Sequence, residues 1–262
     1  MSDLLTTRPY ADAVPNAQQS LDLFQGKWAS KLPIEGVSTG ETPLFEDPRV
    51  VWALTHLNRL GIETSQSDFL ELGPLEGGHS FGLVRNGVKS VTAIEANKQA
   101  FLKCLVAREV LGYARVRFLL GDAMAFLQAT QESYDVVFAS GFLYHMQDPA
   151  KCLELIASRA RALFLWTVYW DEEFARNHPD VRAGSDGVHP IHYKGREIRL
   201  HRHGYGEGID YSRFWGGPDT HSHWMEREDL KFVLRLNGFT EIHEELETNP
   251  NGCALKLVAV KS

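Results

Sequence analysis

The feature that most constrains this chain is a glycine-rich turn between a short apolar run and a helix-like segment. The turn lies in Phe69-Leu-Glu-Leu-Gly-Pro-Leu-Glu-Gly-Gly78, and the next apolar run, Val91-Thr-Ala-Ile-Glu95, ends in an acidic residue. A strand, a glycine turn, a helix, a second strand and a terminal carboxylate together form a pocket for the ribose and adenine of a nucleotide-like cofactor. The sequence therefore predicts a cofactor site at the carboxyl ends of parallel strands.

Apolar runs alternate with helical patterns from Phe69 to about Thr167, which predicts a parallel sheet with crossover helices. Asn97 is placed to cap a helix over Lys98–Leu111, and Gly112 to end it. The predicted strands are Phe69–Leu72, Ser90–Ile94, Val116–Leu120, Tyr134–Ala139 and Ala162–Thr167, and the other predicted helices of this region are Ala123–Ala129 and Ala150–Arg159, with Asp148-Pro149 at the start of the second.

The C-terminal region predicts a different ending for the sheet. An amphipathic helix over Glu226–Asn237 precedes two strand-like runs, Phe239–Leu246 and Ala254–Val260, and the short turn-forming segment between them predicts an antiparallel hairpin. Pro48–Leu60 predicts a helix packed on the sheet. The expected fold is a Rossmann-like α/β fold, with a doubly wound, mostly parallel seven-stranded sheet that ends in an antiparallel hairpin.

The rest of the chain divides into an N-terminal cap or lid segment, residues 1–47, and a cofactor-binding domain, residues 48–262. The domain contains a long insertion after the fifth strand, residues 171–223, with eight glycines, three prolines and seven of the chain's eleven histidines. It has no sustained apolar periodicity, so we predict a long functional loop on the substrate side.

Composition excludes several classes of protein. The formal charge of −7 argues against a protein that binds nucleic acid through general electrostatics. No apolar run approaches the length of a membrane-spanning helix, and the N-terminus shows no secretory signal. Cys104, Cys152 and Cys253 have no CxxC spacing and indicate reduced thiols rather than disulfides. We expect a cytoplasmic monomer or homodimer.

Four motifs occur in register with these elements. They are Glu71 with Gly73 and Gly77, then Glu95, then Gly121-Asp122, then Tyr134-Asp-Val-Val-Phe-Ala-Ser-Gly141. Together with the terminal hairpin they resemble the class I S-adenosylmethionine-dependent methyltransferases, over about residues 50–262. Leu75 departs from the pattern, since a middle glycine is common there. Ser140–His145 followed by Asp148-Pro149 is also similar to a stretch of the enzymes that carboxymethylate the wobble uridine of tRNA.

The resemblance implies S-adenosyl-L-methionine as the cofactor and assigns its contacts. Gly73, Gly77 and Gly78 let the backbone pass close to the methionine moiety. Glu71 orients the turn or contacts the amino group of the cofactor through water, and a purely structural role is an equal alternative. Glu95 accepts hydrogen bonds from the ribose hydroxyls, and Asp122 accepts one from the adenine amino group and can also cap the next helix. The remaining expected cofactor contacts are Ala96, Asn97, Ala123, Ser140, Gly141, Tyr144, Trp28 and Lys31. For the last two, an equal alternative is that Trp28 is only a packed aromatic residue and Lys31 only a solvated lysine.

The methyl acceptor is expected at the end of the fourth strand. His145 is the nearest candidate for a catalytic base, needed only if the acceptor must lose a proton, and it can instead be a wall residue. His223 is the second catalytic candidate. The expected substrate contacts are His221, Trp224, Tyr169 and Trp170. The pairs His201-x-His203 and His221-x-His223 can also be read as metal ligands, with Asp210 or Asp219, but we predict no metal.

The leading hypothesis is in-line methyl transfer to an oxygen or nitrogen atom of a small molecule. One alternative is an RNA-alkylating enzyme of the wobble-uridine type, which needs a basic channel. Another is a protein that binds the cofactor without transferring its methyl group. A nicotinamide dehydrogenase is disfavoured, because Leu75 breaks the glycine template and the terminal hairpin is not expected of that class.

Overall fold

The computed structural model describes residues 10–11, 13–205, 219–249 and 252–261. Its main sheet has seven strands in the order β3-β2-β1-β4-β5-β10-β9. The strands are β1 Asp68–Leu72, β2 Ser90–Glu95, β3 Val116–Leu120, β4 Tyr134–Ser140, β5 Ala160–Tyr169, β9 Phe239–Asn249 and β10 Gly252–Lys261. The first five are parallel to one another, and β10 is antiparallel to both β5 and β9. The expected doubly wound sheet and its terminal hairpin are confirmed.

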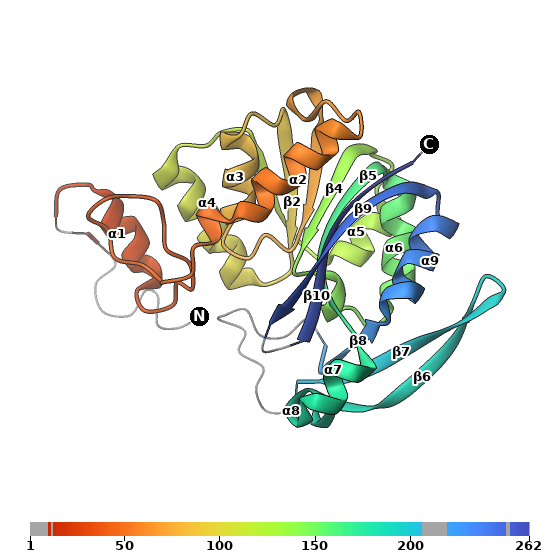
Figure 1. The fold of residues 1–262 in the computed structure, drawn as a ribbon. Coiled ribbons are helices and arrows are strands. Elements are labelled where there is room, and N and C mark those ends of the chain that lie inside the picture. The colour runs from red at the N-terminus through yellow and green to blue at the C-terminus, as the bar shows by residue number, and fades with distance from the viewer. Residues whose placement is uncertain (1–9, 12, 206–218, 250–251, 262) are drawn as a thin grey trace.

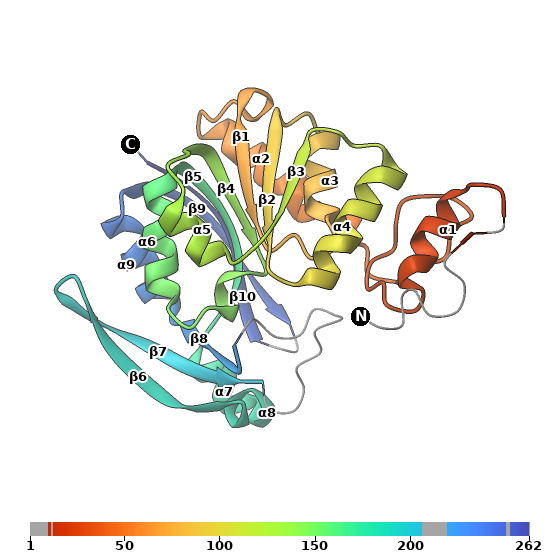
Figure 2. The same ribbon diagram turned by 180° about the vertical axis from the view of Figure 1, so that it is seen from behind.

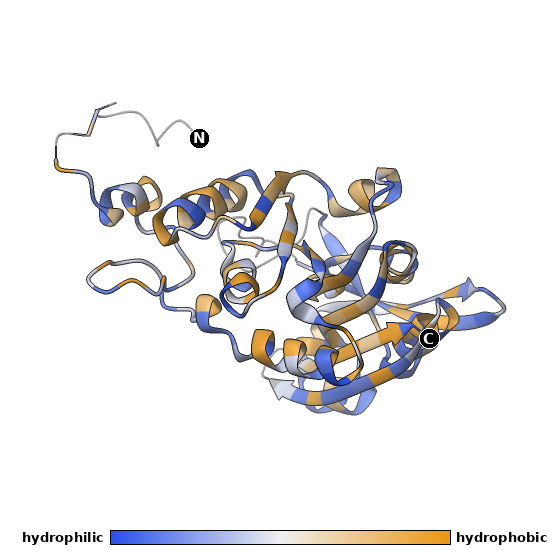
Figure 3. Ribbon diagram, turned by 90° about the horizontal axis from the view of Figure 1, so that it is seen from above, coloured by the Kyte–Doolittle hydropathy of each residue, from blue (hydrophilic) through white to orange (hydrophobic). Residues whose placement is uncertain are grey.

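Helices cover both faces of this sheet (Figures 1 and 2). One face carries α2 Pro48–Arg59, α3 Gly78–Arg85 and α4 Lys98–Leu111, and the other carries α5 Ala123–Ala129, α6 Pro149–Arg159 and α9 Arg227–Leu236. Figure 3 shows hydrophobic and hydrophilic residues mixed along these helices, as expected when only one side of each helix is buried. Two hydrophobic clusters, one on each side of the sheet, form the core.

Local capping residues explain why several predicted helices begin where they do. Asn97 Oδ1 accepts hydrogen bonds from Gln99 N and Ala100 N, and Asp122 and Asp148 cap α5 and α6 in the same way. Gly112 ends α4 with a left-handed backbone. These contacts involve residues close in sequence, so the sequence pattern could reveal them.

The N-terminal segment packs beside α4 rather than on the sheet (Figure 1). It contains the short helix α1 Ala17–Leu21 and the 3-10 turns η2 Asp22–Phe24 and η3 Leu44–Glu46. Its own small cluster includes Leu21, Phe24, Trp28 and Leu32, with Ala107 of α4 beneath them.

The insertion after β5 is not the long loop that the sequence predicted. Its described part forms α7 Glu172–Asn177, α8 Pro179–Ala183 and an antiparallel sheet of β6 Ser185–Tyr193, β7 Arg196–Gly204 and β8 His221–Met225. The prediction failed because β6 is almost entirely exposed and therefore has no apolar alternation. No described helix is long and apolar enough to span a membrane.

Candidate functional site

The glycine turn between β1 and α3 has the backbone conformation that its sequence predicts. Gly73 and Gly77 have φ values of 69° and 83°. Leu75 occupies the position where a middle glycine is common, and it still has a positive φ, 55°. A side chain at Gly77 would lie 2.9 Å from the Tyr113 hydroxyl, so packing as well as conformation requires glycine there.

Glu95 connects this turn to the end of β2. Its Oε2 accepts the N–H of Leu75 at 2.9 Å, and its Oε1 accepts the N–H of Asn97 at 2.8 Å. Burial raises the pKa of Glu95 to about 7, although these backbone N–H groups oppose the shift. The carboxyl group therefore lies at the end of β2, beside the glycine turn, and fixes the backbone around it.

Glu71 belongs to a buried polar chain under the turn. Its carboxyl group accepts a hydrogen bond from the Ser80 hydroxyl, and His79 Nδ1 lies 3.8 Å from its other oxygen. Burial raises the pKa of Glu71 to about 8, and the nearby Glu95 adds to this effect. On its other side, His79 Nε2 hydrogen-bonds Asp47 at 2.9 Å. These contacts favour an orienting role for Glu71.

Asp47 connects these buried polar groups to Arg49, a residue that no sequence motif indicated. Burial alone would raise the pKa of Asp47, but hydrogen bonds from His79 and Arg49 hold it well below its usual value. The Arg49 guanidinium lies 4.4 Å from the centre of the Trp166 ring. Tyr144 also contacts Trp166, edge to face at 6.0 Å. Arg49 therefore lies next to the end of β4.

The ends of β2 and β3 carry the other predicted contacts of the adenosine moiety. Asp122 is exposed and accepts the N–H of Ala125 at 2.6 Å, so it is the N-cap of α5. Ala96 is exposed and Ala123 is buried. Because β3, β2, β1 and β4 are neighbours in the sheet, the structure brings these residues to the same edge as the glycine turn.

The end of β4 carries Ser140, Gly141, Tyr144 and His145. Gly141 has a φ of 75°, and the buried Ser140 hydroxyl has no hydrogen-bond partner among the described residues. His145 Nδ1 lies 2.6 Å from the hydroxyl oxygen of Tyr205, which follows β7. Burial lowers the pKa of His145 to about 4, with a contribution from His203, so its imidazole is neutral at pH 7.

The small sheet brings some of the predicted acceptor residues toward His145. His203 stacks on Trp224 at 4.3 Å and meets Tyr205 edge to face at 5.9 Å. His223 Nδ1 hydrogen-bonds the carbonyl oxygen of Gln147 at 2.7 Å, which ties β8 to the loop after β4. His221 lies against His223, with ring centroids 5.5 Å apart.

Other predicted residues lie in packed positions. Tyr169 belongs to the main core, and burial raises its pKa to about 12. Trp170 stacks on His201 at 4.3 Å, and its indole N–H donates to Glu172. Trp28 donates its indole N–H to the Leu21 carbonyl oxygen within the N-terminal cluster, and Lys31 is exposed. For Trp28, these contacts favour a packing role over the expected contact with the cofactor.

One group of described residues, His56, His243 and Glu245, has its side-chain ligand atoms within 4.8 Å of one another. Lys256 pairs with one oxygen of Glu245 at 2.9 Å, and Trp52 donates to the other at 2.7 Å. The two imidazoles stack at 4.3 Å with an angle of 14°, so lone pairs in the two ring planes do not converge on one point. This group lacks the geometry of a metal site. Asp210, one of the suggested ligands, lies outside the described residues.

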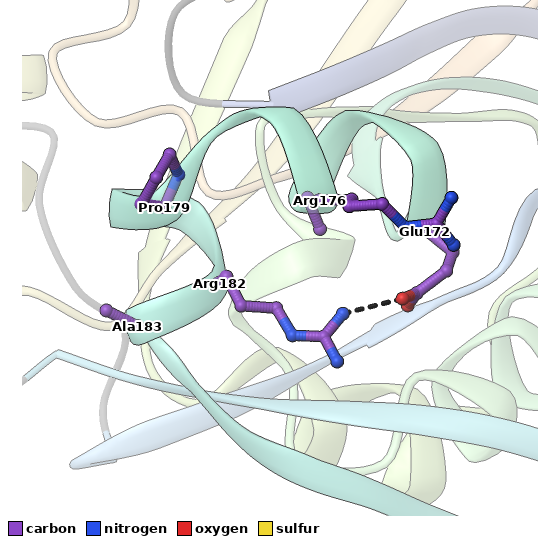
Figure 4. A pocket seen from close by; sticks show the side chains of 6 residues that line it. Glu172, Arg176, Pro179, Arg182 and Ala183 are labelled. Carbon is purple, nitrogen blue, oxygen red and sulfur yellow. Dashed lines mark hydrogen bonds and ion pairs between the residues drawn. The ribbon is translucent and has the colours of Figure 1, made fainter.

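A hollow of about 420 Å³ lies on α7 and α8, away from the glycine turn. Its lining residues are Glu172, Ala175, Arg176, Pro179, Arg182 and Ala183. Figure 4 shows that Arg182 and Glu172 pair with each other across it, and their charged atoms are 2.6 Å apart. None of the predicted cofactor or acceptor residues lines this hollow.

Comparison with known proteins bears on the fold and on the class of protein. Residues 63–167 match a family model described as a methyltransferase domain. None of the curated proteins matches the chain. Among solved structures, the N-terminal domain of EvdMO1, with SAH bound, has a TM-score of 0.72 and 20% identity, covering 97% of this chain and 100% of that one.

Two further solved structures resemble the fold. Magnesium protoporphyrin IX methyltransferase (ChlM) from Synechocystis PCC 6803, with bound SAH, has a TM-score of 0.58 and 17% identity, covering 97% of this chain and 91% of that one. The N-methyltransferase NodS from Bradyrhizobium japonicum WM9, in complex with S-adenosyl-L-homocysteine (SAH), has a TM-score of 0.52 and 15% identity, covering 94% and 99%.

The seven-stranded sheet with its antiparallel ending is the fold of the class I methyltransferases, and the matched domain is a methyltransferase domain. The fold and the matched domain together support an S-adenosylmethionine-dependent methyltransferase. The cofactor is S-adenosyl-L-methionine, and the ends of β1 to β3 carry groups of the kind expected to hold it: a turn with positive φ, a buried carboxyl group and a helix N-cap.

Proposed function

We propose that the protein transfers the methyl group of S-adenosyl-L-methionine to an oxygen or nitrogen atom of a small molecule bound between the end of β4 and the small sheet. The observation that carries this proposal is the contact of 2.6 Å between His145 Nδ1 and the Tyr205 hydroxyl oxygen. It joins the strand end where the methyl donor is expected to the insertion that is expected to bind the acceptor.

The chemistry requires little of the protein beyond alignment. Methyl transfer is an in-line displacement in which the acceptor lone pair attacks the methyl carbon and the sulfonium sulfur leaves as a thioether. A neutral His145 can assist a hydroxyl acceptor. When its Nδ1–H donates to the Tyr205 oxygen, Nε2 is free to take the proton that the acceptor releases.

Buried polar atoms on the small sheet support a polar acceptor. His203 Nδ1 and Trp224 Nε1 are buried and have no hydrogen-bond partner among the described residues, and the buried Ser222 hydroxyl lies near that of Tyr205. His203 and Ser222 are directly opposite each other on β7 and β8, and Trp224 follows two residues later on the same face. The hydroxyl, carbonyl or amino groups of a small molecule can supply the missing partners.

The acidic chain and its structural neighbours also support a small acceptor. The net charge of −7 is unfavourable for a polyanionic substrate. ChlM is named as a magnesium protoporphyrin IX methyltransferase and NodS as an N-methyltransferase, and the EvdMO1 domain was also crystallised in the presence of D-fucose. We further propose a cytoplasmic protein, a monomer or homodimer, with a cap over residues 1–47 and a catalytic domain over residues 48–262.

The test is transfer of labelled methyl from S-adenosyl-L-methionine into a cell extract that is then separated into metabolite, RNA and protein fractions. We expect label in the metabolite fraction. His145→Gln should reduce the transfer rate strongly and leave SAH affinity close to that of the wild type. His243→Gln is the matched control, because His243 is an exposed residue of β9, and it should change neither the transfer rate nor the SAH affinity.

Label in the RNA fraction would replace the proposal with the wobble-uridine alternative, for which the likeness of Ser140–His145 is the supporting observation. Bound cofactor without label in any fraction would favour a protein that binds the cofactor without transferring its methyl group. Full activity of His145→Gln would remove this residue from the reaction and leave the acceptor site to be located elsewhere.

A further inference from the structure

A buried carboxylate lies in the middle of the glycine turn and faces the N-terminal segment. The side chain of Glu76 is completely buried. Its Oε1 accepts the N–H of Ala29 at 3.1 Å, and its Oε2 accepts the N–H of Ser30 at 2.8 Å. Glu76 therefore binds two successive backbone amides that precede it in the chain by more than forty residues.

Lys103 of α4 completes this arrangement. Its side chain is 2% exposed, and its Nζ lies 2.7 Å from Glu76 Oε1. The same ammonium group donates a hydrogen bond to the carbonyl oxygen of Lys27 and lies 5.7 Å from the centre of the Trp28 ring. The ion pair thus contacts each of residues 27–30 and connects them to both the glycine turn and α4.

The residues on both sides of Glu76 have the unusual backbone of the cofactor-binding turn. Leu75 and Gly77 have φ values of 55° and 83°. A left-handed conformation is unfavourable for leucine by about 1–2 kcal/mol, so other contacts must hold Leu75 in place. Glu95 accepts the N–H of Leu75, and the Cys104 thiol donates to its carbonyl oxygen at 3.3 Å. Cys104 is the neighbour of Lys103 on α4.

The N-terminal segment also packs directly against the start of α3. A Cβ atom at Gly78 would lie 2.7 Å from the carbonyl carbon of Leu44, so glycine is required where the segment crosses the helix. Gly40 allows a similarly close approach inside the segment, where a Cβ would lie 2.2 Å from the carbonyl oxygen of Ala29. Residues 27–44 and the turn at 75–78 therefore fit together through backbone contacts.

A buried ion pair is a poor source of stability, because removing two charges from water offsets most of their attraction. The ion pair instead fixes the relative position of the elements that carry it, because each charge has its partner in only one arrangement of those elements. We propose that Glu76 and Lys103 are positioning residues that couple residues 27–44 to the cofactor-binding turn, so that the N-terminal segment and S-adenosyl-L-methionine stabilise each other. This inference rests on the cofactor assignment and is independent of the acceptor.

Coupling of this kind is reciprocal. If the docked segment improves cofactor binding, the bound cofactor must stabilise the docked segment by the same factor. The test therefore uses two measurements with the product SAH as the probe: its affinity by titration calorimetry, and the rate of tryptic cleavage after Lys27 and Lys31 with and without SAH. In the wild type, we expect SAH to slow cleavage at both lysines.

Glu76→Gln is the decisive variant. A glutamine replaces one of the two carboxylate oxygens with an NH₂ donor, which would face the N–H of Ala29 or of Ser30, and it removes the negative charge beside Lys103. We expect SAH affinity to fall by about tenfold or more, as for the loss of one or two buried hydrogen bonds, and SAH to lose its protection of Lys27 and Lys31. The control is Asp229→Asn, because Asp229 is also buried and accepts one backbone amide, from Arg199, and one guanidinium, from Arg196.

Asp229→Asn should lower the unfolding temperature and leave SAH affinity within twofold of the wild type. The double variant Glu76→Gln/Lys103→Met also removes the buried ammonium that Glu76 neutralises, so we expect it to regain stability relative to Glu76→Gln without regaining affinity. Coupling is refuted if Glu76→Gln binds SAH within twofold of the wild type, or if affinity recovers together with stability in the double variant. Absence of SAH binding by the wild type would instead refute the cofactor assignment, and the coupling with it.

Discussion

At the scale of single residues, the site uses buried carboxyl groups that bind the protein's own backbone and side chains. Glu95 holds the backbone of Leu75 and Asn97, and Glu71 holds Ser80. The burial that fixes these groups also raises the pKa of both, to about 7 and about 8. The site should therefore respond to pH near neutrality.

Cofactor affinity should increase between pH 6 and pH 8. The ionised carboxylate of Glu95 is the better acceptor for the ribose hydroxyls, so SAH binding should favour this form and release a proton. Titration calorimetry in two buffers of different ionisation enthalpy would measure the proton release. Glu95→Gln should bind more weakly and without this pH dependence; a wild-type affinity that is equal at pH 6 and pH 8 would contradict the assignment.

Glu71 should affect stability rather than affinity. Its pKa is about 8 in the folded protein and 4.5 when unperturbed, so the folded state keeps a proton that the unfolded state loses. The stabilisation is full below pH 4.5 and is lost as pH rises toward 8. Urea unfolding at pH 5, 6.5 and 8 should show decreasing stability, with a smaller decrease in Glu71→Gln, which cannot ionise. If the unfolding free energies of the wild type and Glu71→Gln decreased equally with pH, Glu71 would be excluded as the cause of the decrease.

Asp122 has two expected roles that one substitution can separate. Serine is a good N-cap, so Asp122→Ser should keep α5 and the stability of the protein. The shorter side chain cannot reach the adenine amino group, so SAH affinity should fall by about 1–3 kcal/mol. Calorimetry and thermal unfolding of the same variant would test this. An unchanged affinity would leave Asp122 as a helix cap only.

At the scale of elements, the N-terminal segment and α3 meet without room for a side chain. Gly78→Ala places a methyl group 2.7 Å from the Leu44 backbone, which must move away. We expect a loss of about 1–3 kcal/mol in stability and weaker SAH binding. Gly204→Ala is the control, because a Cβ there meets nothing within 4 Å and should change little. Equal unfolding temperatures for the two variants would show that the segment adapts easily.

The elements that the sequence predicted well are those with local signals. The helix Lys98–Leu111 and the strand Val116–Leu120 were predicted with the observed bounds, because Asn97, Gly112 and buried apolar residues mark them. The small sheet was missed because its strands depend on pairing partners distant in sequence: β8 pairs with β7 across residues 205–220, and β6 is exposed. Position in the chain alone could not reveal these pairs.

The same distinction explains the site. The glycines and Glu95 follow strand ends and could be predicted from the pattern around them. Glu76 and Lys103 are 27 positions apart and bind a segment still more distant, so their partners were not visible in the sequence. An acidic residue inside an apolar glycine turn was the available signal. Arg49 and Tyr205 reach the site from a preceding helix and from the insertion.

At the scale of the whole molecule, SAH should raise the unfolding temperature, because it binds the folded state only. At one hundred times its dissociation constant the ligand adds about 2.7 kcal/mol, or an increase of roughly 5–10 °C for a protein of this size. Thermal unfolding followed by tryptophan fluorescence would measure it. The dinucleotide NAD serves as the control and should give no shift; a shift with NAD and none with SAH would reverse the cofactor assignment.

The position of β10 has a consequence for how the protein is made. This strand pairs with β5 on one side and β9 on the other, although it follows β5 by more than eighty residues. At roughly 5–20 residues per second, a ribosome adds these residues in about 4–17 seconds. During that time β5 presents an apolar open edge of the kind that recruits foreign strands. The rate of synthesis therefore sets a lower limit on the time for which the edge of β5 stays without its partner strand.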